Sequence, residues 1–107
     1  MSEETQQAQV RDNPDESRYE VHLDGELAGF AEYEFDDKLV DFTHTEVFEQ
    51  FSGKGLAQQL AAESLDDVRS RGLQALPHCA FYAKYLAKNP EYVDLVPADR
   101  RAEFDLA

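Results

Sequence analysis

QFSGKGLAQQL, residues 50–60, is a short loop of glycine and lysine that runs without a break into helix-forming sequence. Beyond the loop, apolar and small residues recur every four positions from Leu56 to Val68, which is the spacing of a buried stripe along a helix. The sequence therefore predicts a helix over residues 55–71. Gly72 follows it directly and is suited to cap its C-terminus.

A loop that opens a helix leaves several backbone N–H groups unpaired at the positive end of the helix dipole. Gly53 and Gly55 let the backbone approach a bulky anion and adopt positive φ, and Lys54 adds positive charge. These features predict an anion site. Two nucleotide loops are excluded, because the upstream glycine of a Walker A loop is absent and Gln58 replaces the third glycine of a Rossmann fingerprint.

The stretch before the loop predicts β-structure. Apolar and polar residues alternate over residues 18–23, and Asp24-Gly25 is typical of a tight hairpin turn. A second strand is expected over residues 26–35, with Gly29 marking a bulge or a close approach of backbones. Residues 38–48, KLVDFTHTEVF, then predict a third strand that continues towards a fourth.

After the helix, LQALP (residues 73–77) predicts a short buried strand and CAFYAKYLAKN (residues 79–89) a second amphipathic helix that stops before Pro90. This order of elements predicts an α/β fold organised around one strand–loop–helix junction. The length of 107 residues suits one compact domain with one modest core. Residues 1–17 have little to bury and are expected to form a flexible acidic tail.

The composition argues against several classes of function. With 23 acidic and 10 basic side chains, the formal net charge of −13 opposes binding to a nucleic-acid backbone. The single cysteine, Cys79, excludes an intrachain disulfide, and the three histidines lack the tight spacing of metal ligands. No apolar run approaches the roughly 20 residues that cross a bilayer, and the start of the chain lacks a secretion signal. We therefore expect a cytoplasmic protein that binds no metal, nucleic acid or membrane.

Through Gln50, Gly53 and Gly55 the loop fits Q/R-x-x-G-x-G/A, the pattern with which GNAT N-acetyltransferases hold the pyrophosphate of acetyl-CoA. Residues 44–92, from HTEVF to NPEY, closely resemble the small single-domain GNAT-like proteins. The resemblance covers residues 18–95 and leaves residues 96–107 as a C-terminal extension. It implies a minimal GNAT-like fold, a mostly antiparallel mixed sheet of about five strands with helices packed on it.

The resemblance also implies a function, the transfer of acetyl from acetyl-CoA to an amine by direct attack in a ternary complex. Backbone groups of the strand before the loop would hold the donor, with an N–H near Val47 stabilising the oxyanion. Lys84 and Lys88 lie four apart on one helix face, where they either meet the 3′-phosphate of CoA or simply face solvent. The residues expected to bind acetyl-CoA are Thr45, Val47, Phe48, Gln50, Phe51, Ser52, Gly53, Lys54, Gly55, Leu56, Ala57, Tyr82, Lys84 and Lys88.

Four residues are candidates for the chemistry, and each has a structural alternative. His44 suits a general base or is a hydrogen-bonded histidine at a strand end. Glu46, on the same strand face, is the other candidate base or a surface carboxylate. Cys79 is expected in the first turn of the last helix, where a lone cysteine is otherwise an inert small hydrophobic residue. The resemblance pairs it with His44 near the thioester, where it would form a transient acetyl-cysteine or line the pocket. Tyr85 either protonates the departing thiolate or packs in the core.

The acceptor is an unidentified amine, either a small molecule or a protein, and the strong acidity of the chain hints at a cationic one. Common GNAT domains carry extra helices near the start that shape the acceptor pocket, and these have no counterpart here. A non-catalytic CoA or acyl-CoA-binding module, or an interaction protein that keeps only the scaffold, is therefore the alternative function.

Overall fold

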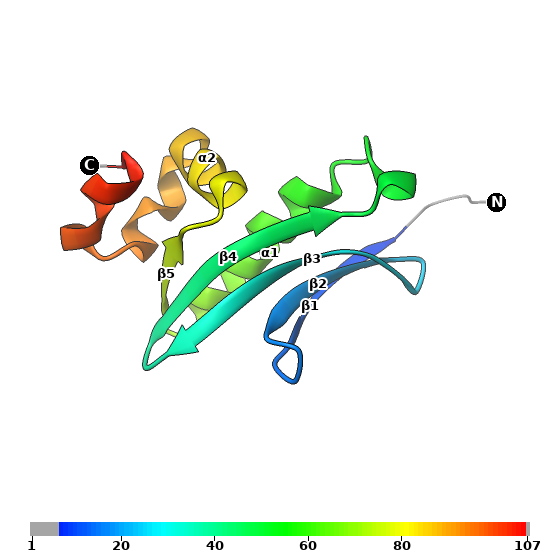
Figure 1. Ribbon diagram of the computed structural model, residues 1–107, viewed down its shortest axis with the longest axis horizontal. Coiled ribbons are helices and arrows are strands. Elements are labelled where there is room, and N and C mark those ends of the chain that lie inside the picture. Colours follow the sequence, from blue (N-terminus) through cyan, green and yellow to red (C-terminus); the bar gives the residue numbers. More distant parts are fainter. Residues whose placement is uncertain (1–6, 107) are drawn as a thin grey trace.

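The computed structural model describes residues 7–106, which form a five-stranded sheet with two α-helices and three short 3-10 helices (Figure 1). The strands follow one another across the sheet in chain order; β1 to β4 are antiparallel neighbours, and β5 runs parallel to β4. The expected α/β class and mostly antiparallel mixed sheet are confirmed. The elements are β1 (Ala8–Asn13), β2 (Arg18–Leu23), β3 (Glu26–Asp36), β4 (Leu39–Val47), η1 (Glu49–Phe51), α1 (Leu56–Ser70), β5 (Gln74–Pro77), α2 (Ala80–Lys88), η2 (Pro90–Leu95) and η3 (Ala98–Phe104).

Strand β1 occupies a segment that the sequence assigned to the flexible tail, so that assignment is wrong for this part of the tail. Its residues pair in register with β2. Ala8 and Val10 pack against the core, and Asp12 accepts a 2.6 Å hydrogen bond from the Tyr33 hydroxyl. The strand forms a hairpin with β2, which follows after a short turn, and its bond from Tyr33 comes from 21 residues further along the chain. Residues 1–6 of the expected tail lie outside the described residues.

Strand β4 is continuous where the sequence predicted two successive strands. Tyr33 pairs with Phe42 and Glu32 pairs with His44, so Thr43 is an extra residue that forms a bulge. Because of the bulge, one strand spans the whole stretch. The bulge also reverses which side chains face the core: even-numbered residues do so up to Phe42, and odd-numbered residues do so after the bulge. The sheet keeps five strands because β1 supplies the fifth.

Helix α1 and its C-terminal cap match the prediction. Gly72 adopts a left-handed φ of 70°. Its N–H donates to the carbonyl of Arg69, and the N–H of Leu73 donates to the carbonyl of Val68, each at 3.0 Å. This pair of bonds is a Schellman motif, in which glycine accommodates the positive φ without a Cβ penalty.

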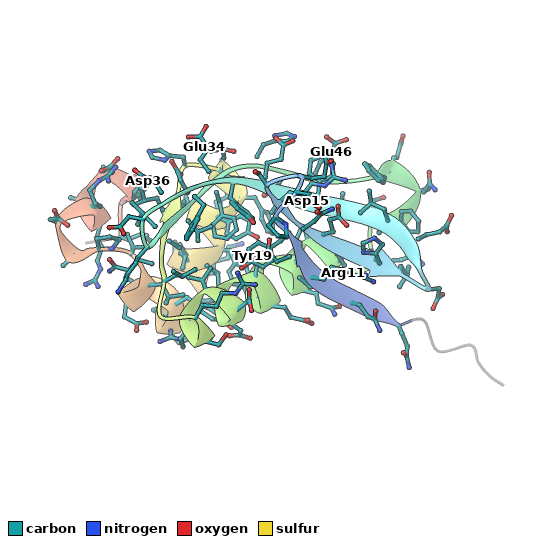
Figure 2. All side chains as sticks on the ribbon, turned by 90° about the horizontal axis from the view of Figure 1, so that it is seen from below. Arg11, Asp15, Tyr19, Glu34, Asp36 and Glu46 are labelled. Carbon is teal, nitrogen blue, oxygen red and sulfur yellow. The ribbon has the colours of Figure 1, made fainter. Side chains whose placement is uncertain are left out.

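The helices and the sheet enclose one core. The ring of Tyr82, from α2, stacks on Phe42 of β4 with centroids 4.1 Å apart, and its hydroxyl lies 2.7 Å from Ser64 Oγ on α1. Tyr19 also points toward α1 (Figure 2). In the described part of the chain, no helix is long and apolar enough to span a membrane, and no group of three or more His, Cys, Asp or Glu side chains could hold a metal ion.

The opposite face of the sheet is not covered by α1. Glu34, Asp36 and Glu46 point away from the helix on this side (Figure 2), and all three are exposed. We call this surface the open face of the sheet. Its charged and aromatic side chains remain accessible beside the strand that leads to the glycine loop.

Glu20 is a buried carboxylate, only 6% exposed. It accepts hydrogen bonds from Asn13 Nδ2 at 2.9 Å and from Arg18 Nε at 2.8 Å. Burial raises the pKa of Glu20, but these two hydrogen bonds together with the charges of Arg18 and His22 hold the pKa below its usual value. The ionised carboxylate thereby links β2 to the last residue of β1.

Candidate functional site

The glycine loop leaves the start of α1 without a cap. Gly53 and Gly55 adopt left-handed φ angles of 80° and 74°, and Gly55 is the N-cap residue, which has no side chain to offer. The first helical bond runs from Gln59 N–H to the Gly55 carbonyl at 3.1 Å. The backbone N–H groups of residues 55–58 therefore have no partner within the helix, and the first turn carries no acidic residue.

These N–H groups adjoin an open cavity of about 540 Å³. A Cβ atom added at Gly53 or Gly55 would meet no other atom within 4 Å, so the surface above both glycines is free. Seven of the residues expected to bind acetyl-CoA line the cavity together with Gln58, which the sequence reasoning missed. The position of Gln58 in the first turn of the predicted helix could have indicated that it lies at this site. The lining residues are Val47, Phe51, Ser52, Gly53, Gly55, Leu56, Ala57 and Gln58.

Beside the cavity, β4 has one unpaired edge. Its pairing with β5 ends at Phe42 opposite Pro77, whereas residues 44–47 pair with β3. Within the described chain, no strand covers the other edge of that segment. Alternate backbone N–H and C=O groups there are available to an extended ligand, because a strand directs them to both of its edges. Thr45 and Val47, two of the predicted binding residues, lie in this segment.

Cys79 is the N-cap residue of α2, one position before the helical turn in which the sequence placed it. It has extended backbone angles because its N–H donates to the Phe42 carbonyl at 2.7 Å and so continues the contact between β5 and β4. Its side chain is buried, and Sγ lies 3.2 Å from Oγ1 of Thr45. The thiol therefore reaches the strand segment with the unpaired edge.

His44 and Glu46 lie on the other side of that strand, on the open face. His44 Nε2 is 3.4 Å from Glu46 Oε1, and both side chains are more than half exposed. The His44 ring approaches Phe30, with centroids 6.3 Å apart. Because His44 and Thr45 are successive residues of β4, their side chains point to opposite faces. The strand thus separates His44 from Cys79, which the sequence reasoning had placed together.

A second, smaller cavity of about 170 Å³ adjoins the first, because Gln58 lines both. Lys84, Tyr85 and Lys88 of α2 also line it. Burial, followed by the charges of Glu91 and Asp66, raises the pKa of Tyr85, so its hydroxyl is protonated at neutral pH. The two lysines and the tyrosine therefore share one concave surface with the start of α1.

The remaining predicted residues are placed as follows. Tyr82 belongs to the core: it is fully buried, contacts Ser64 and lines neither cavity, so the structure does not bring it together with the other predicted binding residues. Phe48 precedes η1, and its ring approaches Phe30 with centroids 6.1 Å apart. Gln50 is exposed in η1, and Lys54 is exposed in the loop between the two glycines.

Residues 18–95 match the family model of the GCN5-related N-acetyl-transferases. Protein NATD1 from Xenopus tropicalis is 42% identical over 53 residues, 50% of this chain and 49% of that protein. The human Protein NATD1 is 41% identical over 59 residues, 54% of this chain and 52% of that protein. The chain thus matches about half the length of these curated relatives.

The solution NMR structure of a GCN5-like protein from Staphylococcus aureus has the same fold. It aligns with a TM-score of 0.63 at 20% identity, over 83% of this chain and 87% of that one. The family match extends from the start of β2 to the end of η2 and includes the uncapped helix, the glycine loop and the unpaired strand edge. On this match, the chain belongs to the GCN5-related N-acetyltransferase family.

Proposed function

We propose that the chain binds acetyl-CoA and transfers its acetyl group to an amine. The observation that carries the proposal is the uncapped start of α1, which opens onto the cavity of about 540 Å³ next to the unpaired edge of β4. A helix N-terminus with free N–H groups favours a phosphate. An extended thioester arm suits a strand edge, so the two neighbouring features fit the two ends of one ligand.

The loop would hold the pyrophosphate. The N–H groups of residues 55–58 donate to its oxygens, Gly53 keeps the surface open for them, and Lys54 and Gln50 flank the site. Lys84 and Lys88 line the adjoining cavity, and their positive charge suits the 3′-phosphate. These are the chain's own groups for binding the nucleotide end of the ligand.

The unpaired edge of β4 would hold the thioester end. Backbone groups from Thr45 to Phe48 would accept and donate along the edge, and an N–H near Val47 would stabilise negative charge on the carbonyl oxygen. Acetyl-CoA supplies an activated acyl group with a thiolate leaving group. Cys79, buried against Thr45, closes the inner side of this segment.

Proton transfer would involve groups on both sides of β4. His44, with Glu46 beside it on the open face, is a candidate to take a proton from the acceptor amine. Tyr85 keeps its hydroxyl proton at neutral pH because burial raises its pKa, and it is the candidate donor to the departing sulfur. The acceptor itself is an amine whose identity is open, and the net charge of −13 favours a cationic one.

The glycines provide a matched test of the binding step. Gly53, Gly55 and Gly72 all have φ between 70° and 80°, and a Cβ at each meets nothing within 4 Å. Alanine should therefore cost each position a similar strain, about 1 kcal/mol of unfolding free energy. Calorimetry should show acetyl-CoA binding weakened at least tenfold in Gly53→Ala and Gly55→Ala, and unchanged in Gly72→Ala at the opposite end of α1. Equal binding by all three variants, or no saturable binding by the wild type, would refute the site.

A non-catalytic CoA-binding module is the second candidate. It is favoured by one observation: α1 leaves uncovered the face that carries His44, so no helical wall forms an acceptor pocket there in the described chain. Thiol release from acetyl-CoA in the presence of spermidine or a lysine-rich peptide distinguishes the two functions. An N-acetyltransferase releases thiol faster with the acceptor than without it, whereas a binding module shows tight binding and the same slow release in both cases.

A further inference from the structure

His78 lies where β4 and β5 separate. The last cross-strand pair joins Phe42 to Pro77, and the Cys79 N–H still donates to the Phe42 carbonyl at 2.7 Å. This bond fixes the backbone on both sides of His78. The Cys79 side chain is buried on the inner side, whereas the His78 side chain is 45% exposed and contacts Asp41. His78 is therefore held beside Asp41, in the paired part of β4 just before the unpaired edge begins.

Asp41 orients the His78 ring. Its Oδ1 lies 2.7 Å from His78 Nδ1, and its own side chain is only 24% exposed. A carboxylate at this distance selects the tautomer in which Nδ1 carries the proton and leaves Nε2 as the basic nitrogen of the neutral ring. Within the described residues, Nε2 has no hydrogen-bond partner. The nearest carboxylate oxygen, Glu103 Oε2, is 3.7 Å away, which is too far for a hydrogen bond.

The C-terminal 3-10 helix η3 supplies the surroundings of Nε2. The Phe104 ring meets the His78 ring edge-on, with centroids 5.0 Å apart. A hydrogen bond from Arg100 holds the pKa of Glu103 below its usual value, so this carboxylate is ionised at neutral pH. An imidazolium formed by protonation at Nε2 would therefore have a carboxylate on each side, Asp41 from β4 and Glu103 from η3. Both stabilise the positive charge.

His44, the other histidine on the open face, is less well oriented. Its contact with Glu46 is 3.4 Å long, and both partners are more than half exposed. Water competes for such a contact, and the ring can rotate away from it. His78 has the shorter carboxylate bond, the more buried partner and a ring contact that fixes its plane. It meets the geometric requirement for a general base better than His44 does.

We propose that His78 is an acid–base catalytic residue of the acetyl transfer, and that Asp41 is the residue that positions it; this rests on the proposed function. His78 Nε2 takes one proton from the acceptor ammonium, and the freed nitrogen lone pair forms the N–C bond while the C–S bond breaks. Tyr85 gives its hydroxyl proton to the thiolate sulfur and recovers the second proton from the nitrogen. The His78 imidazolium then returns its proton to solvent, which completes the balance of one amide, one thiol and one proton.

The kinetic test compares conservative variants in acetyl transfer to spermidine. His78→Gln should lower kcat about 100-fold near neutral pH, the range of a lost acid–base group. The wild-type rate should fall on acidification, as an imidazole base becomes protonated, and this fall should be absent in His78→Gln. Calorimetry should show that the variant binds acetyl-CoA with unchanged affinity. His44→Gln should cost at least tenfold less. A His78→Gln enzyme with the wild-type pH profile, or a greater loss in His44→Gln, would overturn the assignment.

A second measurement does not need turnover. Nitrogen-15 NMR of the imidazole rings should show neutral His78 protonated at Nδ1 in the wild type. In Asp41→Asn this preference should weaken, while the His44 signals stay in place. Neutral His78 protonated at Nε2 in the wild type would overturn the proposal whether or not spermidine is acetylated. Absence of acetyl-CoA binding in the same sample would instead count against the proposed function, so the two failures are distinguishable.

Discussion

Ser64 and Tyr82 form a buried hydroxyl pair whose two halves should have unequal effects on stability. Ser64 Oγ donates to the Ala61 carbonyl at 3.1 Å, so the 2.7 Å contact with Tyr82 uses the tyrosine hydroxyl as donor. Both residues are fully buried, and burial raises the pKa of Tyr82. Tyr82→Phe removes a donor and leaves the serine proton satisfied, whereas Ser64→Ala leaves a buried hydroxyl with no acceptor.

The magnitudes follow from the geometry. Tyr82→Phe keeps the ring stacked on Phe42 and should lose one net hydrogen bond, about 1 kcal/mol of unfolding free energy. Ser64→Ala should cost about 2–3 kcal/mol, because the phenol hydroxyl is buried without a partner. In the double variant no polar group is stranded, so its loss should return to about 1 kcal/mol. The coupling between the two sites is then about 2–3 kcal/mol.

Guanidinium denaturation of the wild type, the two single variants and the double variant measures this cycle. In a domain of this size, each kcal/mol also lowers Tm by about 4–8 °C. The reasoning is refuted if Ser64→Ala is no more destabilising than Tyr82→Phe, or if the effects of the two changes simply add. Acetyl-CoA affinity of Tyr82→Phe should equal that of the wild type. A loss of affinity would return Tyr82 to the binding site.

Three further predictions test other parts of the structure. Gly29→Ala should destabilise the fold by about 1–3 kcal/mol in denaturation, since its Cβ would lie 2.5 Å from the backbone oxygen of Glu46; wild-type stability would show that the strands can part. Replacing both Lys84 and Lys88 with glutamine should weaken acetyl-CoA binding roughly tenfold, because two exposed ion pairs are lost, and should leave the binding of acetyl-3′-dephospho-CoA unaffected. Equal losses of affinity for the two ligands would place the 3′-phosphate elsewhere. Because the pKa of Glu20 is lowered on folding, its contribution is present above the pKa of the unfolded chain and is lost as the pH falls through the folded-state pKa. The stability difference between wild type and Glu20→Gln should therefore shrink on acidification, and a growing difference would contradict the hydrogen-bonded carboxylate.

Local signals were sufficient for the helix and the hairpin. The four-residue spacing from Leu56 to Val68 and the glycine at position 72 are properties of one continuous stretch, and the structure places α1 and its cap there. Strand β1 had no such signal, because only Ala8 and Val10 alternate in it. Its pairing partner β2 and the Tyr33 bond to Asp12 come from later in the chain. Although β2 follows after a short turn, the weak alternation within β1 does not mark it as a strand, and the supporting bond from Tyr33 lies 21 residues away.

By itself, the sequence determined where the glycine loop meets the start of α1, because the glycine spacing and the four-residue period of the helix are properties of one continuous stretch. Only the tertiary structure decided on which side of β4 each candidate lies. The Thr43 bulge reverses the alternation of side chains, which turns His44 to the open face and Thr45 towards Cys79. The contact of Asp41 with His78 joins β4 to the residue that follows β5, and α1 separates the two in the chain. Such placements depend on strand register and helix packing, which long-range contacts set and which a single sequence does not display.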